Sequence, residues 1–459
     1  MRDAPNIVST IRREAMPYAG RHALTQGGRS RTYADLFDDI GRVANDLRAQ
    51  GVRPGDLVAF VSDDSIEYVV AALAVLEIGA VLMPLSTALS SKEYDEACLR
   101  ISPDVSLSIA SEGSCAVTLH ERTRRSEVFY GLGPAFIRFS SGTTGASKGV
   151  LLSHQAVIDR TDAAQTRLRI SEKDRVVWLL SMSFHFVVTI LLFLRKGAEI
   201  VLCGDGFPNA MFSAMREKPC TFIYASPFHY AMMNSSAECT SRMLSSVRMA
   251  VSTASALGID TAQAFKTKFG KDLSQAYGII EIGLPCVNDA VTDGTIASVG
   301  TVSPDYECLI RDPDADGNGV VLFRGKGMYN AYVSPWKLRE DWFDTGDIGA
   351  IRGRFLFLKG REKTVINFAG MKVFPQDVET VLNAHPAVAE SLVSGKAHAL
   401  YGQLPVAALV AKPNIAKPSD RELRQFCLKS LDAYKVPKEF VWVETLPKTA
   451  SGKLQRHQA

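Results

Sequence analysis

The chain has 459 residues, and its composition is that of an ordinary folded protein with almost no net charge. Hydrophobic residues make up 46% and charged residues 22%, which excludes a disordered chain. The formal charge of +3 gives no argument for nucleic-acid binding, for which a strongly basic face is expected. At roughly 100–200 residues per domain, the length predicts two to four folding units.

Eight cysteines are spread along the chain, and no two are closer than 17 residues. This spacing excludes a CxxC pair and is too sparse for a disulfide scaffold, so we expect free thiols and a cytoplasmic location. The N-terminal residues lack an apolar core after a basic start, which predicts no signal peptide. Residues 176–194 carry no formal charge, but Ser181, Ser183 and His185 interrupt them, so we expect no transmembrane segment.

The first part of the chain alternates helical and strand patterns. Thr32 followed by Asp35 predicts a capping box, and apolar residues follow at helical spacing. Residues 57–61 then read as a buried strand, 65–78 as a helix and 80–85 as another strand. Strand, helix and strand in this order predict a right-handed parallel unit.

The same alternation continues through the middle of the chain. An apolar helix is predicted at 186–194. Further strands are predicted near residues 135–139, 176–180, 198–202, 221–225 and 247–251. The leading fold class is therefore α/β with a mostly parallel sheet.

After about residue 295 the strands become short and turns become frequent, with a dense turn cluster at 313–319. Residues 320–323 and 354–358 are predicted to be strands of a smaller antiparallel element. We expect a large N-terminal domain, 1–360, of parallel-sheet α/β subdomains plus a small β-barrel-like subdomain. A small α+β C-terminal domain, 361–459, is expected to follow it.

The first segment with chemical character is the loop Phe139–Gly149, which follows a predicted strand. Its three glycines permit tight turns that expose N–H groups, and its hydroxyls and one lysine add further donors. Such a loop suits a polyphosphate. It is not a Walker A loop, because the GxxxxGK[ST] spacing is absent. The alternative interpretation is a flexible surface loop.

Three further segments have a functional and an ordinary interpretation. Gln275–Glu281 places a carboxylate after a Tyr-Gly turn, where it can hold Mg²⁺ or merely start a helix. Trp342–Asp347 places an acidic residue in a tight turn, where it can accept both hydroxyls of a ribose or be a common Asp turn. Pro447–Arg456 contains a Ser-Gly-Lys sequence within what is otherwise a frayed basic terminus.

Taken in this order and spacing, the four segments strongly resemble the acyl-adenylate-forming superfamily, which contains acyl- and aryl-CoA ligases, adenylation domains of peptide synthetases and luciferases. The resemblance covers Thr32 to Arg456 and is strongest to the CoA ligases. It implies phosphate-binding residues Ser140, Ser141, Gly142, Thr143, Thr144, Gly145 and Lys148. It implies adenine- and ribose-binding residues Thr253, Ala254, Ser255, Gln275, Tyr277, Gly278, Asp347 and Arg361.

The resemblance also implies catalytic residues and an acid pocket. Lys453 matches the catalytic lysine of the mobile C-terminal domain, and Glu281 matches the Mg²⁺ carboxylate. Lys363 matches the hinge, and Gly370 the loop that lines the thiol tunnel. His185, the third catalytic candidate, lies after Phe184 at the pocket entrance. The implied pocket residues are His185, Val188, Ser226, Thr253, Gly278, Ile279 and Ile280.

The implied activity is that of an AMP-forming carboxylic acid–thiol ligase that uses ATP, Mg²⁺ and CoA. A rival within the class loads the acyl group onto the phosphopantetheine of a carrier protein, and a different class binds nucleotide or acid without turnover. The small-molecule acid is expected to be aryl or alkyl, because the pocket is mostly apolar. An α-amino acid is disfavoured, because residues 187–189 offer no carboxylate for an ammonium group. We expect a monomer or homodimer.

One departure from the family pattern bears on this activity. Ile280 stands where a threonine is usual before the glutamate, and the threonine hydroxyl normally lies near the α-phosphate. Its loss removes a donor and adds apolar bulk. This change is expected either to slow adenylation or to shape the acid pocket, and it keeps the inactive alternative open.

Overall fold

The computed structural model divides into two compact units, and each is described by itself. Unit 1 comprises residues 1–307 and 324–343, and unit 2 comprises residues 308–323 and 344–459. The structure describes residues 5–110, 113–139, 148–204, 206–369 and 371–448. The boundary expected after residue 360 concerns a functional hinge and stays a prediction.

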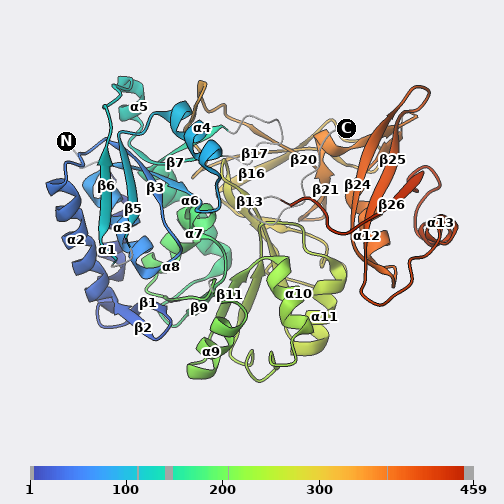
Figure 1. Ribbon diagram of the computed structural model, residues 1–459, viewed down its shortest axis with the longest axis horizontal. Coiled ribbons are helices and arrows are strands. Elements are labelled where there is room, and N and C mark those ends of the chain that lie inside the picture. Colours follow the sequence, from blue (N-terminus) through green and yellow to red (C-terminus); the bar gives the residue numbers. More distant parts are fainter. Residues whose placement is uncertain (1–4, 111–112, 140–147, 205, 370, 449–459) are drawn as a thin grey trace. The chain divides into compact units, whose positions relative to one another are not determined.

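Helices of unit 1 alternate with strands along most of its length (Figure 1). The helices are α1 (Ile7–Ala15), η1 (Met16–Tyr18), α2 (Tyr33–Ala49), α3 (Ile66–Ile78), α4 (Ser91–Ile101), α5 (Glu127–Gly131), α6 (His154–Leu168), α7 (Met182–His185), η2 (Phe186–Ile190), α8 (Leu191–Arg195), α9 (Asn209–Glu217), α10 (Pro227–Ser235) and α11 (Ile259–Phe269).

One sheet of unit 1 has eight strands in the order β19-β18-β8-β7-β4-β3-β5-β6. Its centre is parallel, with β4 between β3 and β7 and β5 on the far side of β3. The strands are β3 (Leu57–Val61), β4 (Val81–Leu85), β5 (Val105–Ile109), β6 (Cys115–Leu119), β7 (Pro134–Phe139), β8 (Gly149–Ser153), β18 (Ala331–Val333) and β19 (Trp336–Leu338). This confirms the parallel unit predicted for the first part of the chain.

A second sheet of unit 1 runs in the order β15-β14-β13-β12-β11-β9-β10-β1-β2. Its strands are β1 (His22–Gln26), β2 (Arg29–Thr32), β9 (Arg175–Trp178), β10 (Glu199–Leu202), β11 (Phe222–Ala225), β12 (Met249–Ser252), β13 (Leu273–Ile279), β14 (Gly283–Val287) and β15 (Gly300–Val302). The six strands from β13 to β1 pair in parallel. The carboxyl ends of β9, β11, β12 and β13 therefore meet at one edge.

Local sequence chemistry explains where the first helices begin. Thr32 and Asp35 form the predicted capping box of α2, with each side chain bound to the other residue's backbone. The Ser65 hydroxyl accepts from the amide of Tyr68 and caps α3, and Gly79 ends that helix in the left-handed conformation. The residues of α3 are almost all buried in the largest apolar core, which also holds side chains of both sheets.

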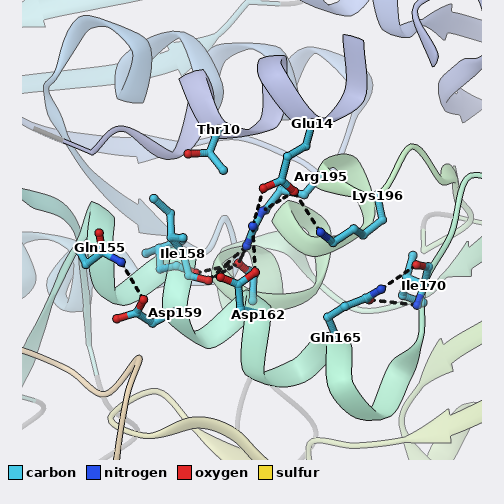
Figure 2. A network of polar contacts seen from close by, with 12 residues as sticks. Thr10, Glu14, Gln155, Ile158, Asp159, Asp162, Gln165, Ile170, Arg195 and Lys196 are labelled. Carbon is cyan, nitrogen blue, oxygen red and sulfur yellow. Dashed lines mark hydrogen bonds and ion pairs between the residues drawn. The ribbon is translucent and has the colours of Figure 1, made fainter. Parts of the chain in front are cut away.

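A polar network joins α1 to α6 and α8 (Figure 2). Arg195, at the end of α8, is 3% exposed and forms ion pairs with Glu14 of α1 at 2.7 Å and Asp162 of α6 at 2.9 Å. It also donates to the carbonyl oxygen of Ile158 and the hydroxyl of Thr161. Because buried ions need paired partners, this network fixes the position of α8 against two other helices.

Unit 2 contains an antiparallel run of strands in the order β16-β17-β20-β21, followed by a five-stranded sheet. Its elements, the first three of which begin or end in unit 1, are β16 (Tyr306–Arg311), β17 (Gly319–Gly325), β20 (Phe343–Arg352), β21 (Phe355–Arg361), η3 (Glu362–Thr364), β22 (Ile366–Phe368), β23 (Met371–Val373), α12 (Pro375–Asn383), β24 (Val388–His398), β25 (Gly402–Ala411), α13 (Asp420–Leu428) and β26 (Glu439–Val443). The five-stranded sheet packs its own apolar core against α12 and α13, as expected of an α+β domain.

The segment predicted as one apolar helix over 186–194 is two elements. Phe186–Ile190 is a π-helical turn, and α8 follows it. The Thr189 hydroxyl donates to the carbonyl oxygen of His185 at 3.1 Å, which competes with the backbone ladder at this point. Such wide turns are frequent at functional sites. Among the described residues, no helix is long and apolar enough to cross a membrane.

Candidate functional site

The carboxyl ends of four parallel strands bring most of the predicted pocket residues to the same edge of the second sheet of unit 1. His185 lies in the segment after β9, Ser226 directly follows β11, and Thr253 directly follows β12. The strand register aligns these ends, because Ala225 pairs with Ser252, which in turn pairs with Gln275 of β13. This edge is where α/β sheets usually bind ligands.

An aromatic wall stands behind His185. The Trp178 ring stacks on Tyr224, with centroids 5.5 Å apart, and meets the His185 ring edge-on at 6.4 Å. His185 itself is partly buried at the start of the π-helical turn, while Val188 is partly buried and packs against the main core. The described ring neighbours of His185 are therefore aromatic, and its role at the acid pocket stays a prediction.

Ser226 has a partner that sequence reasoning missed. Its hydroxyl lies 2.7 Å from Nδ1 of His229, which also accepts from the Ser226 amide. Burial lowers the pKa of His229 to about 4, so the imidazole is neutral at physiological pH. The signal available in the sequence was a Ser-Pro start with His at the third helical position, the place of a capping partner.

The loop after β12 carries a strained residue. Ala254 has φ +73°, a left-handed conformation that costs a residue with a Cβ about 1–2 kcal/mol. Such strain persists only where the surroundings enforce it, and it concentrates at binding sites. Thr253 is buried and Ser255 is exposed, so the three predicted adenine-loop residues pass from the core to the surface.

The β13–β14 hairpin holds the next predicted residues. Gln275 and Tyr277 are buried, and the strand pairing shifts between Tyr277 and Ile279. A Cβ on Gly278 would lie 2.2 Å from the carbonyl oxygen of Gly283, so only glycine permits this close approach. The hairpin geometry thus gives Gly278 a structural reason to be present. Ile279 and Ile280 follow, both partly buried.

Glu281 ends this segment in an environment rich in cations. It is 7% exposed, and its Oε1 lies 3.4 Å from the hydroxyl of Tyr332, whose pKa is raised by burial and by the Glu281 charge. Lys148 lies above the Tyr332 ring, with Nζ 4.7 Å from the centroid. Buried Arg160 donates to the carbonyl oxygen of Ile280 at 3.2 Å. The contacts bring the lysine of the predicted phosphate loop towards the predicted metal carboxylate.

Arg138 is a second residue that sequence reasoning missed. It lies on β7, one residue before the predicted phosphate loop begins, and is partly buried. Its Nη1 donates to the carbonyl oxygen of Phe184, and its guanidinium carbon lies 5.1 Å from the centre of the Phe184 ring. Burial lowers the pKa of Arg138 to about 10, and the Glu281 charge opposes that shift. An arginine in a strand otherwise built from apolar residues was the available signal.

Unit 2 holds the predicted ribose residues as a pair. Asp347 of β20 is opposite Arg361 of β21, and Arg361 Nε lies 2.8 Å from the Asp347 carboxylate. Arg361 also donates to the carbonyl oxygen of Thr345 at 2.7 Å. Gly346, the residue before Asp347, takes a positive φ, which glycine adopts without steric cost. The ion pair orients the Asp347 carboxylate within strand β20, where the sequence predicts a tight turn, while Lys363 is exposed in η3.

Several predicted residues lie outside the described residues. They are Ser140, Ser141, Gly142, Thr143, Thr144 and Gly145 of the phosphate loop, Gly370 of the predicted thiol tunnel, and Lys453. Their roles stay predictions. Among the described residues, there is no cluster of three or more His, Cys, Asp or Glu side chains suited to a metal ion. A cation at Glu281 would therefore need phosphate or water oxygens as its other ligands.

The chain matches known proteins over nearly its whole length. Residues 11–333 match the AMP-binding enzyme family, and residues 377–453 match the AMP-binding enzyme C-terminal domain. A 4-coumarate–CoA ligase-like protein (number 9) of Oryza sativa subsp. japonica is 29% identical over 97% of this chain and 90% of that protein. Indoleacetate–CoA ligase of Aromatoleum aromaticum is 27% identical over 97% of this chain and 96% of that protein.

Solved structures share the fold. The crystal structure of ATP-bound MatB from Rhodopseudomonas palustris superposes with a TM-score of 0.87 and 24% identity, covering 98% of this chain and 97% of that one. At this identity the likeness speaks for the fold alone. It agrees with the predicted fold class of a large α/β part followed by a small domain of strands and helices.

Proposed function

Because the chain belongs to the AMP-binding enzyme family, we propose that it is an AMP-forming acid–CoA ligase. It activates an aryl or alkyl carboxylic acid with ATP and transfers the acyl group to the thiol of CoA. The observation that carries this proposal is the matched family, together with curated CoA ligases similar over almost the whole chain. The described site supports it, because mostly apolar side chains lie at one edge of the sheet and several cationic side chains lie near the Glu281 carboxylate.

In the first step the acid's carboxylate oxygen attacks the α-phosphorus of ATP. The bond between the α-phosphorus and the bridging oxygen breaks, and pyrophosphate leaves with the electron pair. Two anions must approach one another, so fixed positive charge near the reacting atoms lowers the barrier. Lys453 supplies such charge to the carboxylate and α-phosphate, while Lys148 and the hydroxyls of the 140–145 loop hold the outer phosphates.

The nucleoside is assigned to the residues that the family resemblance implies. Thr253, Ala254 and Ser255 line the adenine, and Tyr277 stacks on its face, with Gln275 near the edge of the base and Gly278 beside it. Asp347 accepts the ribose hydroxyls, and Arg361 holds that carboxylate in place through its 2.8 Å ion pair. A carboxylate already oriented by a neighbouring cation binds a diol with little further loss of side-chain entropy.

The residues at Glu281 fit a magnesium ion that accompanies ATP. Glu281 is a buried oxygen donor, and Mg²⁺ prefers oxygen ligands and completes its shell with phosphates and water. When bound, the ion would neutralise charge on the departing pyrophosphate.

In the second step the thiol attacks the acyl carbonyl, and AMP leaves. Lys363 is the hinge about which the C-terminal domain rotates, removing Lys453 and presenting the Gly370 loop to the incoming thiol. One site can thus run two steps with one lid. His185 and Ile280 border the acid pocket, so the apolar Ile280 shapes the space beside the reacting carboxylate.

An exchange assay tests the proposed activity. Wild-type protein is incubated with ATP, Mg²⁺, labelled pyrophosphate and a panel of aryl and alkyl acids, and label entering ATP is measured. We expect exchange with at least one acid, followed by acyl-thioester formation with CoA. No exchange with any acid would contradict the proposal, and transfer to a carrier protein in place of CoA would correct the acceptor.

Lys453→Ala tests the catalytic lysine. We expect exchange to fall by about 100-fold or more, because a positive charge at the transition state is lost, while ATP binding stays nearly intact. Lys448→Ala is the matched control, because Lys448 lies in the same segment, 447–456, as Lys453. Its side chain pairs with Glu390 of β24 at 2.8 Å. Unchanged exchange in Lys453→Ala would remove that lysine from the mechanism.

A further inference from the structure

Strand periodicity places Arg138 on the face of β7 that packs against the segment carrying His185. Side chains alternate along β7, so Phe136 and Arg138 share one face, while Ile137 and Phe139 share the other. Phe136 belongs to the core between the sheets and meets the Phe186 ring at 6.1 Å. Ile137 and Phe139 pack in a different cluster. Arg138 is therefore the residue that ends this core-facing row, next to the segment that carries His185.

The guanidinium of Arg138 has more N–H donors than it uses on the residues that the structure describes. An arginine has five N–H donors. Among the residues that the structure describes, Arg138 makes one hydrogen bond, to the carbonyl oxygen of Phe184, and no ion pair. The face of its guanidinium rests on the Phe184 ring. The ring contact and the single hydrogen bond fix the orientation of the guanidinium, and its other N–H groups make no hydrogen bond to the described residues.

A second polar group near Arg138 is the hydroxyl of Tyr68. The hydroxyl of Tyr68, on α3, is buried without a hydrogen-bond partner among the described residues. The Tyr68 ring meets Phe186 at 5.9 Å, and Tyr68 and Arg138 influence each other's pKa. A buried unsatisfied hydroxyl next to a desolvated cation is costly unless a ligand pairs with them.

The charge around Arg138 favours an anion. Arg160 is a second buried arginine close enough to lower the pKa of Arg138 further, and Glu281 is the carboxylate that opposes this. The Asp64 carboxylate, on the other side of Tyr68, accepts from the amide of Met182 at 2.9 Å. Arg138 and Arg160 thus place two fixed positive charges in a partly desolvated region, where an arginine attracts a carboxylate more strongly than an exposed arginine would.

We propose that Arg138 binds a carboxylate of the acid substrate, with the Tyr68 hydroxyl as a second donor. This inference rests on the proposed function and deepens it, because it gives the mostly apolar pocket a cationic end. The carboxylate is either the reacting group, held for attack on the α-phosphorus, or the second carboxylate of a dicarboxylic acid. In both cases the arginine fork matches the two oxygens of the ligand.

Two matched pairs of acids separate these sources. Benzoate is compared with terephthalate, and hexanoate with adipate, because each pair differs by one carboxylate. Calorimetric titration of the full-length chain gives Kd for each acid, and pyrophosphate exchange gives KM for the acid and for ATP. The variants are Arg138→Met, Tyr68→Phe and Arg29→Met; Arg29 is an exposed arginine paired with Glu67 and serves as the control.

We expect Arg138→Met to raise Kd by about 30-fold or more and Tyr68→Phe by about 3- to 10-fold, with KM for ATP and the Arg29→Met values unchanged. A loss confined to the two dicarboxylates assigns the second carboxylate, whereas an equal loss for all acids assigns the reacting one. If Arg138→Met does not fold, Arg138→Lys keeps the charge without the fork and should raise Kd about fivefold.

Two results would overturn the inference. One is an unchanged Kd for every acid in Arg138→Met or Arg138→Lys, and the other is a wild-type chain that binds none of the four acids. Acid binding that depends on Arg138 but supports no exchange would count against the proposed ligase activity alone. The titration therefore separates a failure of this inference from a failure of the proposed function.

Discussion

Two arginines hold the segment 182–195 from its opposite ends, and they do so in different ways. Arg195 contacts five acceptors, which include both oxygens of Glu14 and, through an ion pair, a carboxylate oxygen of Asp162 (Figure 2). Arg138 donates to the carbonyl oxygen of Phe184, its one hydrogen bond among the described residues. Both are desolvated cations in unit 1, but among the described residues the first contacts five acceptors and the second contacts one.

This difference separates an arginine that builds the fold from one that is available to a ligand. Removing a saturated buried cation strands its carboxylate partners, whereas removing an unsaturated one strands little. The comparison therefore predicts that stability and acid binding depend on different arginines. It can be tested by measuring both quantities in the same variants.

Arg195→Met is expected to have the largest effect on stability. It leaves Glu14 with Lys196 alone and removes the cation beside Asp162, at a cost of about 3 kcal/mol in the free energy of unfolding. Urea unfolding measures this change. Arg29→Met, which removes an exposed ion pair, should cost about 1 kcal/mol or less. A loss in Arg195→Met no larger than in that control would break the comparison.

Glu14→Gln is expected to have an intermediate and pH-dependent effect. Burial raises the pKa of Glu14, but hydrogen bonds from Arg195 and Lys196 outweigh it and hold the pKa below its usual 4.5. A carboxyl with a depressed pKa stabilises the fold above its unfolded pKa and loses this contribution as the pH falls. We expect wild type to exceed Glu14→Gln by about 1–3 kcal/mol at pH 7.

The same stability difference should shrink as the pH falls below about 4.5, where the unfolded carboxyl takes up a proton. Unfolding curves at several pH values measure this trend. A difference that stays constant between pH 7 and pH 4 would show that the charge of Glu14 is not what holds α1 to α8.

Arg138→Met is expected to have the smallest effect on stability. It replaces a desolvated cation that has one hydrogen bond with an apolar side chain of similar length, so the free energy of unfolding should change by about 1 kcal/mol or less. The same variant is expected to lose acid binding. A stability loss as large as that of Arg195→Met would show that Arg138 also stabilises the fold, and the two arginines would not differ as we predict.

Much of the fold could be predicted because its signals are local. The capping box of Thr32 and Asp35 lies within four residues, and the strand at 57–61 was predicted with the bounds of β3. The π-helical turn at Phe186–Ile190 could not be predicted, because apolar periodicity looks the same for an α-helix. A single hydroxyl, that of Thr189, meets the His185 carbonyl there.

The candidate site divides in the same way. Glu281, Tyr277 and Asp347 could be proposed from motifs because turn chemistry and spacing mark them. His229 and Arg138 were not proposed from the sequence. His229 occupies a capping position that the sequence offered, whereas the partner of Arg138 becomes evident only when β7 and the segment after β9 are folded together. His229 meets a neighbour three residues away, whereas Arg138 meets one 46 residues along the chain.

The sequence by itself determined the family, the order of α/β elements and the near-neutral charge that made nucleic acid an unlikely partner. These properties depend on composition and on residues close together in the chain. The tertiary structure decided where the few important charges lie. Arg195 and Arg138 look alike in the sequence, and only packing surrounds the first with acceptors and gives the second a single hydrogen-bond acceptor among the described residues. Desolvation and partner geometry act through space, so they have no signature in a short window of sequence.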